Sequence, residues 1–241
     1  MDSLAPTVWF ITGANRGIGL ELVNQLLQSP SNEVFGACRN PVDAASLHAL
    51  AGPGKGTLHI IALDINDSAS IEAAAAEAKA ALGERGIDYL INNAGINPGW
   101  GDSPPVMTVD NMLAAFRTNV IGPALMVQTF APLVARGGKK AIVNVSSTMG
   151  SIASRKPQNQ HSSYSISKAA LNMLTGKLAD SYPDLTVIVM CPGWLETDMG
   201  GAGAGQLPVS TGVGGIIKVA QGLKHEDSGS FIEYTGKRVP W

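Results

Sequence analysis

The chain has 241 residues, of which 45% are hydrophobic and 15% are charged, and this length and composition predict a single domain over residues 1–241. Its 17 basic and 19 acidic residues give a net charge of −2, so we expect neither a nucleic acid nor a membrane as partner. The absence of an uninterrupted apolar stretch of 18 residues and of a signal-like N-terminus indicates a soluble, cytoplasmic protein. Cys38 and Cys191 lack metal-ligand spacing, which predicts two buried thiols and no metal site.

The first motif is a glycine-rich turn between a strand and a helix. Residues 7–12 are apolar or β-branched, as in a strand that is buried on both faces, and residues 20–27 repeat apolar positions with helical period. The glycines between them are spaced GxxxGxG instead of GxGxxG, but they allow a pyrophosphate to approach the backbone and the helix N-terminus. The alternative is a plain tight turn. We interpret the turn as a cofactor site formed by Gly13, Asn15, Arg16, Gly17, Ile18 and Gly19.

The end of the second predicted strand, residues 33–38, indicates which dinucleotide binds. An acidic residue at this point would bind the ribose 2′-hydroxyl of NAD, whereas an arginine accommodates the 2′-phosphate of NADP. Here the strand ends in Cys38 and Arg39, and Arg16 lies in the glycine turn. Two guanidinium groups suit a phosphate dianion, so the sequence predicts NADPH/NADP+ as cofactor. The alternative is a pair of solvated arginines.

Two further strand ends contribute candidate cofactor contacts. The third strand, residues 57–63, is followed by Asp64 and Ile65; Asp64 could accept a hydrogen bond from the adenine amino group or cap the next loop. The fourth strand, residues 87–91, is followed by Asn92, which we interpret as structural, and by Ala94 and Gly95, whose small side chains suit a backbone that borders the cofactor.

Asn119 lies within a predicted helical stretch over residues 108–134, where an asparagine is a mediocre helix former. One explanation is a local helix kink with a bound water linked to Lys168. The other is an exposed asparagine with no special role.

The candidate catalytic groups follow the fifth strand, residues 139–145. Ser147 stands at its carboxyl end and could donate a hydrogen bond to a carbonyl oxygen that gains negative charge. Tyr164 and Lys168 lie four residues apart in a predicted helix over 163–182, so they share one face. A phenol has a pKa of about 10, and a nearby cation lowers it, which suits Tyr164 to proton transfer. A lone Tyr-x-x-x-Lys pair would more often be a surface pair.

The last part of the chain adds a sixth strand at 185–190, a helix at 210–223 and a short strand at 229–234. After the sixth strand, Pro192 and Gly193 could form the floor beneath a nicotinamide ring, and Thr197 could hydrogen-bond its carboxamide or the phosphates. The glycine-rich segment 200–205 predicts a lid over the substrate site.

Strands alternate with helices along the whole chain, which predicts an α/β fold: a Rossmann-type doubly wound parallel sheet of about seven strands with helices on both faces. The set of motifs resembles the short-chain dehydrogenase/reductase family. The segments 37–41, 193–201 and 229–241 resemble its C-factor and sniffer-type carbonyl reductases. The motifs that carry the resemblance are Thr12-Gly13-x-x-x-Gly17-x-Gly19, Asn92-Asn93-Ala94-Gly95, Asn119, Ser147, Tyr164-x-x-x-Lys168 and Pro192-Gly193.

The resemblance implies roles for the candidate residues. Tyr164 would be the acid/base, Lys168 would hold the nicotinamide ribose and lower the pKa of Tyr164, Ser147 would orient the carbonyl, and Asn119 would hold a proton-relay water. It adds Asn92 to the cofactor-binding set. Family members often pair two long helices of each subunit, so the resemblance implies a homodimer. Residues 148–163 are longer here than in the shortest members, and an insertion at this point obstructs the dimer in some relatives.

These observations predict an NADPH-dependent carbonyl reductase that transfers hydride to an aldehyde or ketone, a small-molecule carbonyl substrate, with Tyr164 as general acid. Two alternatives stay open. One is an NAD-linked alcohol or hydroxysteroid dehydrogenase, and the other is a signalling protein that uses the cofactor mainly as a ligand, with little turnover.

Overall fold

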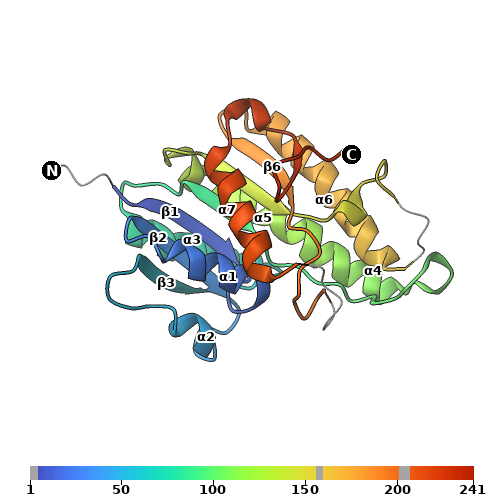
Figure 1. Ribbon diagram of the computed structural model, residues 1–241, viewed down its shortest axis with the longest axis horizontal. Helices are drawn as coiled ribbons and strands as arrows, with labels where there is room; N and C mark the ends of the chain where they lie inside the picture. The colour runs from blue at the N-terminus through green and yellow to red at the C-terminus, as the bar shows by residue number, and fades with distance from the viewer. Residues whose placement is uncertain (1–4, 156–159, 201–206) are drawn as a thin grey trace.

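Seven parallel strands form one sheet in the order β3-β2-β1-β4-β5-β6-β7 (Figure 1). The computed structural model describes residues 5–155, 160–200 and 207–241. The predicted Rossmann-type parallel sheet with helices on both faces is confirmed. Its strands are β1 (Thr7–Thr12), β2 (Asn32–Cys38), β3 (Thr57–Ala62), β4 (Tyr89–Asn92), β5 (Ala141–Val145), β6 (Thr186–Cys191) and β7 (Phe231–Glu233).

The helices follow the order that the sequence predicts, with one difference in their number. The helix after β2 spans only one turn, because a succession of short turns follows it. The predicted helix over 108–134 is divided by a π-helical segment, Arg117–Ile121. The helices are α1 (Gly17–Leu26), α2 (Ala45–His48), α3 (Ser68–Leu82), α4 (Val109–Phe116), α5 (Gly122–Ala135), α6 (Ser162–Ser181) and α7 (Val209–Gly222).

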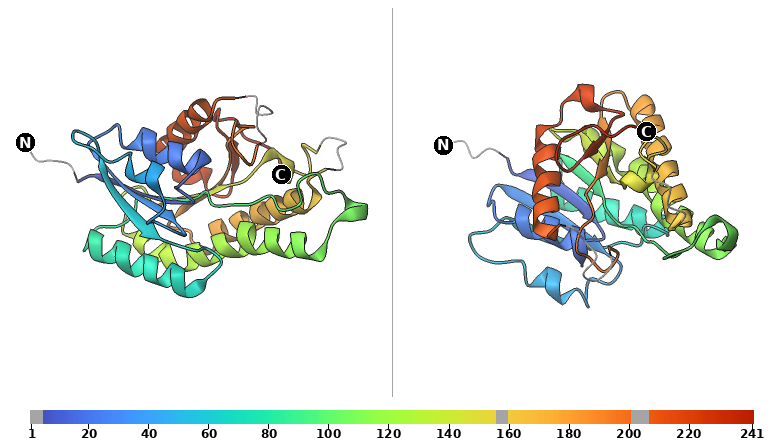
Figure 2. Two further views of the ribbon diagram at one scale, coloured as in Figure 1. Left: turned by 90° about the horizontal axis from the view of Figure 1, so that it is seen from below. Right: turned by 45° about the vertical axis from the view of Figure 1, so that its right-hand side comes forward.

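Both faces of the sheet are buried, because successive side chains of a strand point to opposite sides. On β1, Phe10 packs on the side of α3 and α5, with its ring 4.6 Å from that of Phe130. Trp9 faces the other side, among residues of α1 and α7, and stacks on Tyr89 at 3.9 Å. Figure 2 shows α3, α5 and α6 along one face of the sheet and α1 and α7 along the other.

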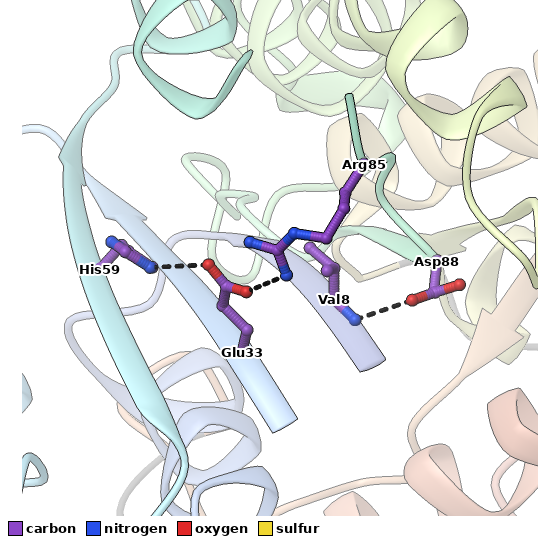
Figure 3. A network of polar contacts seen from close by, with 5 residues as sticks. All are labelled: Val8, Glu33, His59, Arg85 and Asp88. Atoms are coloured by element: carbon purple, nitrogen blue, oxygen red, sulfur yellow. Dashed lines mark hydrogen bonds and ion pairs between the residues drawn. The ribbon is translucent and has the colours of Figure 1, made fainter. Parts of the chain in front are cut away.

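An ion-pair network lies at the amino ends of the strands, away from the edge where ligands bind in such sheets (Figure 3). The carboxylate of Glu33 is paired with Arg85 at 2.5 Å and with His59 at 3.0 Å. Burial opposes ionisation of Glu33, but hydrogen bonds and charge from Arg85 and His59 outweigh it and lower its pKa. Nearby, Asp88 accepts a hydrogen bond of 2.8 Å from the backbone N–H of Val8. These contacts join β1, β2 and β3 to the segment before β4.

Among the described residues, one helical stretch is long and apolar enough, by length and composition, to cross a membrane. It is Val109–Ala135, with a mean hydropathy of 1.3. Asp110 and Arg117 interrupt it, so it is not an uninterrupted apolar stretch. Because 61% of the apolar window is buried inside the protein, the stretch serves as a core helix of this fold.

Candidate active site

A cleft of about 310 Å³ opens at the carboxyl edge of the sheet, between β1 and β4, where the order of the strands reverses. Ligands bind at such a switch point because the loops on either side diverge. Fourteen of the residues predicted to bind cofactor border this cleft. They are Gly13, Asn15, Arg16, Gly17, Ile18, Arg39, Asp64, Ile65, Ala94, Gly95, Tyr164, Lys168, Pro192 and Thr197.

The glycine turn provides an exposed backbone cradle. Gly13 and Gly17 adopt positive φ angles of 67° and 53°, which favour glycine, and a Cβ on Gly13 would lie only 3.0 Å from Ala94 Cα. Gly19 has a different role: a Cβ there would overlap the carbonyl oxygen of Gly13, so it permits close packing of α1 on the turn. The main chain of the turn therefore fits the approach of a pyrophosphate to the start of α1.

The turn is held by side chains that the sequence analysis did not select. Thr12 Oγ1 accepts hydrogen bonds from the N–H groups of Asn93 and Ala94, each at 3.0 Å. The amide of Asn93 donates to the carbonyl oxygen of Thr12 at 2.9 Å. Asn92 instead points away from the cleft and donates to Asn144 Oδ1 at 2.8 Å. Asn93 thus lies on the cleft, and Asn92 ties β4 to β5.

Two arginines, Arg16 and Arg39, border one end of the cleft. Both Arg16 and Arg39 are exposed, and Arg16 makes a 3.3 Å ion pair with Asp198 whose side chains are 63% and 82% exposed. Such an exposed pair is weak and exchanges readily for a stronger partner. Asp64 uses one carboxylate oxygen to accept from Asn66 N at 2.9 Å, so it caps its loop and also borders the cleft.

Tyr164, Lys168 and Ser147 meet at the other end. Both Tyr164 and Lys168 come from the first two turns of α6, while Ser147 follows β5 and hydrogen-bonds with the Tyr164 hydroxyl. The ammonium of Lys168 lies 5.6 Å from the centre of the Tyr164 ring and donates to Val145 O at 2.8 Å. Tyr164 and Lys168 thus border the cleft, and Ser147, which is not among the residues that line it, is joined to it by the hydrogen bond with Tyr164.

Burial determines the direction of the pKa shifts of both Tyr164 and Lys168. It raises the pKa of Tyr164 above its ordinary value, the Cys191 thiol adds to this rise, and the hydrogen bond from Ser147 opposes it. Burial also lowers the pKa of Lys168 to about 8. The net shift of the Tyr164 pKa is therefore upward in this structure, because removal of the phenol from water dominates, and the lowering by Lys168 that the resemblance implies stays a prediction.

Asn119 is fully buried in the π-helical segment. Its side chain accepts from the N–H of Ile96 and donates to the carbonyl of Ile96, both at 2.9 Å, and also donates to Ser167. A Cβ placed on Gly95 would lie 3.2 Å from Asn119 Oδ1 and 3.6 Å from Lys168 Nζ, so these two atoms border the same space. The exposed asparagine considered above is excluded, and the helix irregularity expected at this residue takes the π-helical form.

The loop after β6 borders the cleft through Pro192 and Thr197. Gly193, with φ of 87°, lies instead against the ring of Tyr234, 3.0 Å from the position of an added Cβ. Trp194 donates from its indole nitrogen to the carbonyl oxygen of Gly200 at 3.0 Å. The rest of the predicted lid, 201–205, lies outside the described residues.

Several further residues border the cleft without having been predicted. Most of them are sequence neighbours of predicted residues at the same strand ends, so they could have been predicted from that adjacency. Thr118 is different, because only the packing of the π-helical segment on Asn66 brings it to the cleft. These residues are Cys38, Leu63, Asn66, Asn93, Ile96, Thr118, Val145, Ser146, Asp198 and Met199.

Comparison with known proteins identifies the family to which this architecture corresponds. Residues 7–205 match the family model described as short chain dehydrogenase. The C-signal protein of Myxococcus xanthus is 37% identical over 64% of this chain and 93% of its own length. The NADPH-bound carbonyl reductase from chicken fatty liver superposes with a TM-score of 0.90 at 38% identity, over 99% of this chain and 100% of that one. The carbonyl reductase Sniffer of D. melanogaster gives a TM-score of 0.90 at 30% identity, with the same two coverages.

The family match extends over most of the chain, and the relatives include the C-factor and sniffer types that the sequence resembles. The parallel sheet, the glycine cradle and the Tyr164, Lys168 and Ser147 cluster agree with this assignment. The chain is an oxidoreductase that belongs to the short-chain dehydrogenase/reductase family.

Proposed function

We propose that this protein is an NADPH-dependent carbonyl reductase that acts on aldehydes or ketones. The observation that carries the proposal is the hydrogen-bonded pair Tyr164 and Ser147, beside the buried Lys168, at one end of a cleft whose other end has two arginines. The glycine cradle at Gly13 and Gly17 fits a dinucleotide, because both residues adopt positive φ angles that favour glycine and a side chain on Gly13 would crowd the backbone of Ala94.

The chemistry follows from the donors at the mouth of the cleft. NADPH, when bound, supplies the hydride. Tyr164, whose raised pKa keeps the phenol protonated near neutral pH, donates its proton to the carbonyl oxygen as that oxygen gains charge. Ser147 donates a hydrogen bond to the same oxygen and orients the substrate. Lys168 would hold the ribose hydroxyls of the bound cofactor, and the space between Asn119 and Lys168 suits a water that would return a proton to Tyr164.

Two arguments support NADPH over NADH. Arg39 and Arg16 border the cleft with exposed guanidinium groups, and a 2′-phosphate offers them a stronger partner than Asp198 does. In addition, the chicken fatty liver carbonyl reductase is described as NADPH-bound. An NAD-linked alcohol dehydrogenase would instead need an acceptor for the 2′-hydroxyl near Cys38, and the described residues around it offer the two arginines.

The test is a turnover assay. Purified protein is mixed with NADPH and a panel of aliphatic aldehydes, aromatic ketones, diketones and quinones, and the loss of absorbance at the nicotinamide band is followed. We expect NADPH oxidation with at least one carbonyl class and a slower rate with NADH. Absence of NADPH oxidation over the whole panel, in protein that binds NADPH by fluorescence titration, contradicts the proposal.

A second candidate function is favoured by the similarity to C-signal. In that case the biological effect depends on cofactor binding, and turnover is incidental. Binding and turnover separate in a Tyr164→Phe variant, because this change removes one hydroxyl and leaves the cleft intact. If the variant retains the biological effect without turnover, the binding role is the correct one.

We further propose that the protein forms a homodimer through α4 and α6. These helices pack side by side and leave apolar side chains exposed. Light scattering on the purified protein tests this, with Leu113→Glu as the disrupting variant and Val42→Glu, on the loop before α2, as control. If the parent protein and the Val42→Glu control are both monomers, the proposal is contradicted. The exposed residues are Val109, Met112, Leu113, Phe116, Ile166 and Met173.

A further inference from the structure

The loop between β4 and α4 covers the start of α6, the helix that carries Tyr164 and Lys168. Asp102, on this loop, is only 8% exposed. The backbone N–H of Ser163 donates to its two carboxylate oxygens at 3.3 and 3.4 Å, and the Ser163 hydroxyl donates to Oδ2. The N–H of Ser162 donates to the backbone oxygen of Asp102 at 3.3 Å. A residue sixty positions away in the chain therefore satisfies the first donors of α6.

The residue that precedes α6 cannot do this. It is His161, which adopts a left-handed conformation with φ of 59° and ψ of 37° and makes no side-chain capping bond. Its ring turns instead toward the same loop: Nδ1 accepts from the N–H of Gly101 at 3.2 Å, and the ring centre lies 4.6 Å from that of Trp100. A helix without its own cap frays at the first turn unless another group replaces the cap.

The first turn of α6 determines the position of Tyr164. Ser163 is its immediate neighbour, and the Tyr164 carbonyl accepts from Ser167 Oγ at 2.7 Å, which in turn accepts from Asn119. The Tyr164 hydroxyl must also meet Ser147 on a different segment. The carboxylate of Asp102 lies at the positive end of the helix dipole and fixes the N-terminus of α6. The contact between Tyr164 and Ser147 depends on the position of that N-terminus.

We propose that Asp102 is a positioning residue for the reaction, which acts by capping α6 from the loop beside the substrate site and so holding Tyr164 against Ser147. The inference rests on the proposed reductase function. A positioning role predicts more than the loss of stability that a structural cap predicts. Loss of the cap should displace the phenol, and a displacement of about 1 Å slows the chemical step by up to about a hundredfold, while cofactor binding at the glycine turn is unaffected.

Gly99 offers a second way to disturb the same contact. A Cβ at this position would overlap the Asp102 carboxylate, and the φ of Gly99 lies outside the left-handed region, so alanine fits the backbone. Gly99→Ala therefore moves the carboxylate while keeping its charge. Asp102→Asn keeps an acceptor oxygen and removes the charge. Asp102→Ala removes both.

The matched control is Thr108→Ala. Thr108 caps the neighbouring helix α4, where its side chain accepts from Asn111 N at 3.2 Å, and it borders neither the cleft nor Tyr164. Loss of this cap lowers the melting temperature as loss of any cap does. It leaves the start of α6 in place.

The experiment measures kcat, KM for the carbonyl, NADPH affinity and melting temperature for the four variants and the parent protein, with the folded fraction counted by NADPH titration. For Asp102→Ala and Gly99→Ala we expect kcat to fall by about ten- to a hundredfold with unchanged NADPH affinity. Asp102→Asn should recover most of kcat, and Thr108→Ala should lose melting temperature only. If kcat is unchanged in Asp102→Ala and Gly99→Ala, or falls equally in Thr108→Ala, the proposal is overturned.

A readout without turnover separates this proposal from the proposed function. The four tyrosines are labelled with ¹³C at the ring carbon that bears the hydroxyl, and the Tyr164 signal is assigned with Tyr164→Phe. In the NADPH complex we expect this signal to move in Asp102→Ala and Gly99→Ala and to stay in place in Thr108→Ala. If the parent protein oxidises no NADPH, the reductase function fails, and an unmoved Tyr164 signal would separately refute the positioning role.

Discussion

The ammonium of Lys168 lies 5.6 Å from the centre of the Tyr164 ring and is itself bound to the carbonyl oxygen of Val145 at 2.8 Å. The cation is therefore held by the end of β5 and not by the tyrosine. Its position is set by the sheet, whereas the position of the phenol is set by the start of α6. The two groups can be disturbed separately.

Tyr164→Phe should lower turnover by about a hundredfold to ten-thousandfold, because it removes the proton donor. NADPH affinity should stay close to that of the parent protein, since the glycine turn and Lys168 are untouched. Stopped-flow absorbance and fluorescence titration give the two quantities. Retention of most of the turnover would mean that another group protonates the product.

Lys168 should make the stability of the protein depend on alkaline pH. Burial lowers its pKa to about 8, below the ordinary value of 10.5, so the folded state holds fewer protons than the unfolded state between these values. The unfolding free energy should then rise with pH from about 8 to 10.5. Below pH 8 the destabilisation caused by burying the charged Lys168 is fully present. Urea unfolding of the parent protein and of Lys168→Met at several pH values checks this. The difference between them should favour the parent protein increasingly over that window.

Arg39→Ala should weaken NADPH binding and leave NADH binding unchanged. A charge-assisted hydrogen bond contributes about 1.5–3 kcal/mol, which corresponds to roughly ten- to a hundredfold in the dissociation constant. Fluorescence titration with both cofactors measures it, and Arg136→Ala, an exposed arginine just after α5, serves as control. Equal losses for NADH and NADPH would remove the basis for the cofactor assignment.

Glu33→Gln should destabilise the protein by about 1–3 kcal/mol at pH 7, because Arg85 and His59 lose their carboxylate. The pKa of Glu33 is lowered, so its contribution is present above the unfolded value of 4.5 and is lost as the pH falls through the lower folded value. The difference in unfolding free energy between the two proteins should therefore shrink in acid. Denaturant unfolding at pH 7 and at about pH 3.5 tests this. A difference that is the same at both pH values contradicts the assignment.

The sequence predicted the strands and their order of succession well, because each buried strand is a short apolar run that ends in glycine, proline or a polar residue. It also placed the Tyr164 and Lys168 pair, since helical spacing alone puts residues four apart on one face. Helix ends were less accurate. The end of α2 is set by turns that local composition does not specify.

The site was harder to predict where tertiary contacts decide. Asn92 and Asn93 are identical residues in one segment, and only the strand pairing shows that the first faces β5 and the second faces the glycine turn. Likewise, the direction of the Tyr164 pKa shift depends on burial, which spacing does not reveal. Asp102 carries no local signal for its role, because its partner Ser163 is distant in the chain.

The π-helical segment Arg117–Ile121 makes the length of the chain here as important as its composition. Such a segment accommodates one residue more than a regular helix does. Removal of a single residue from a regular helix rotates everything on one side of it by about 100°, whereas removal of one residue from the π-helical segment leaves a regular helix whose flanking parts keep their faces. Single-residue deletions scanned along residues 109–135 should therefore lower stability least within 117–121, where the loss falls on the placement of Asn119.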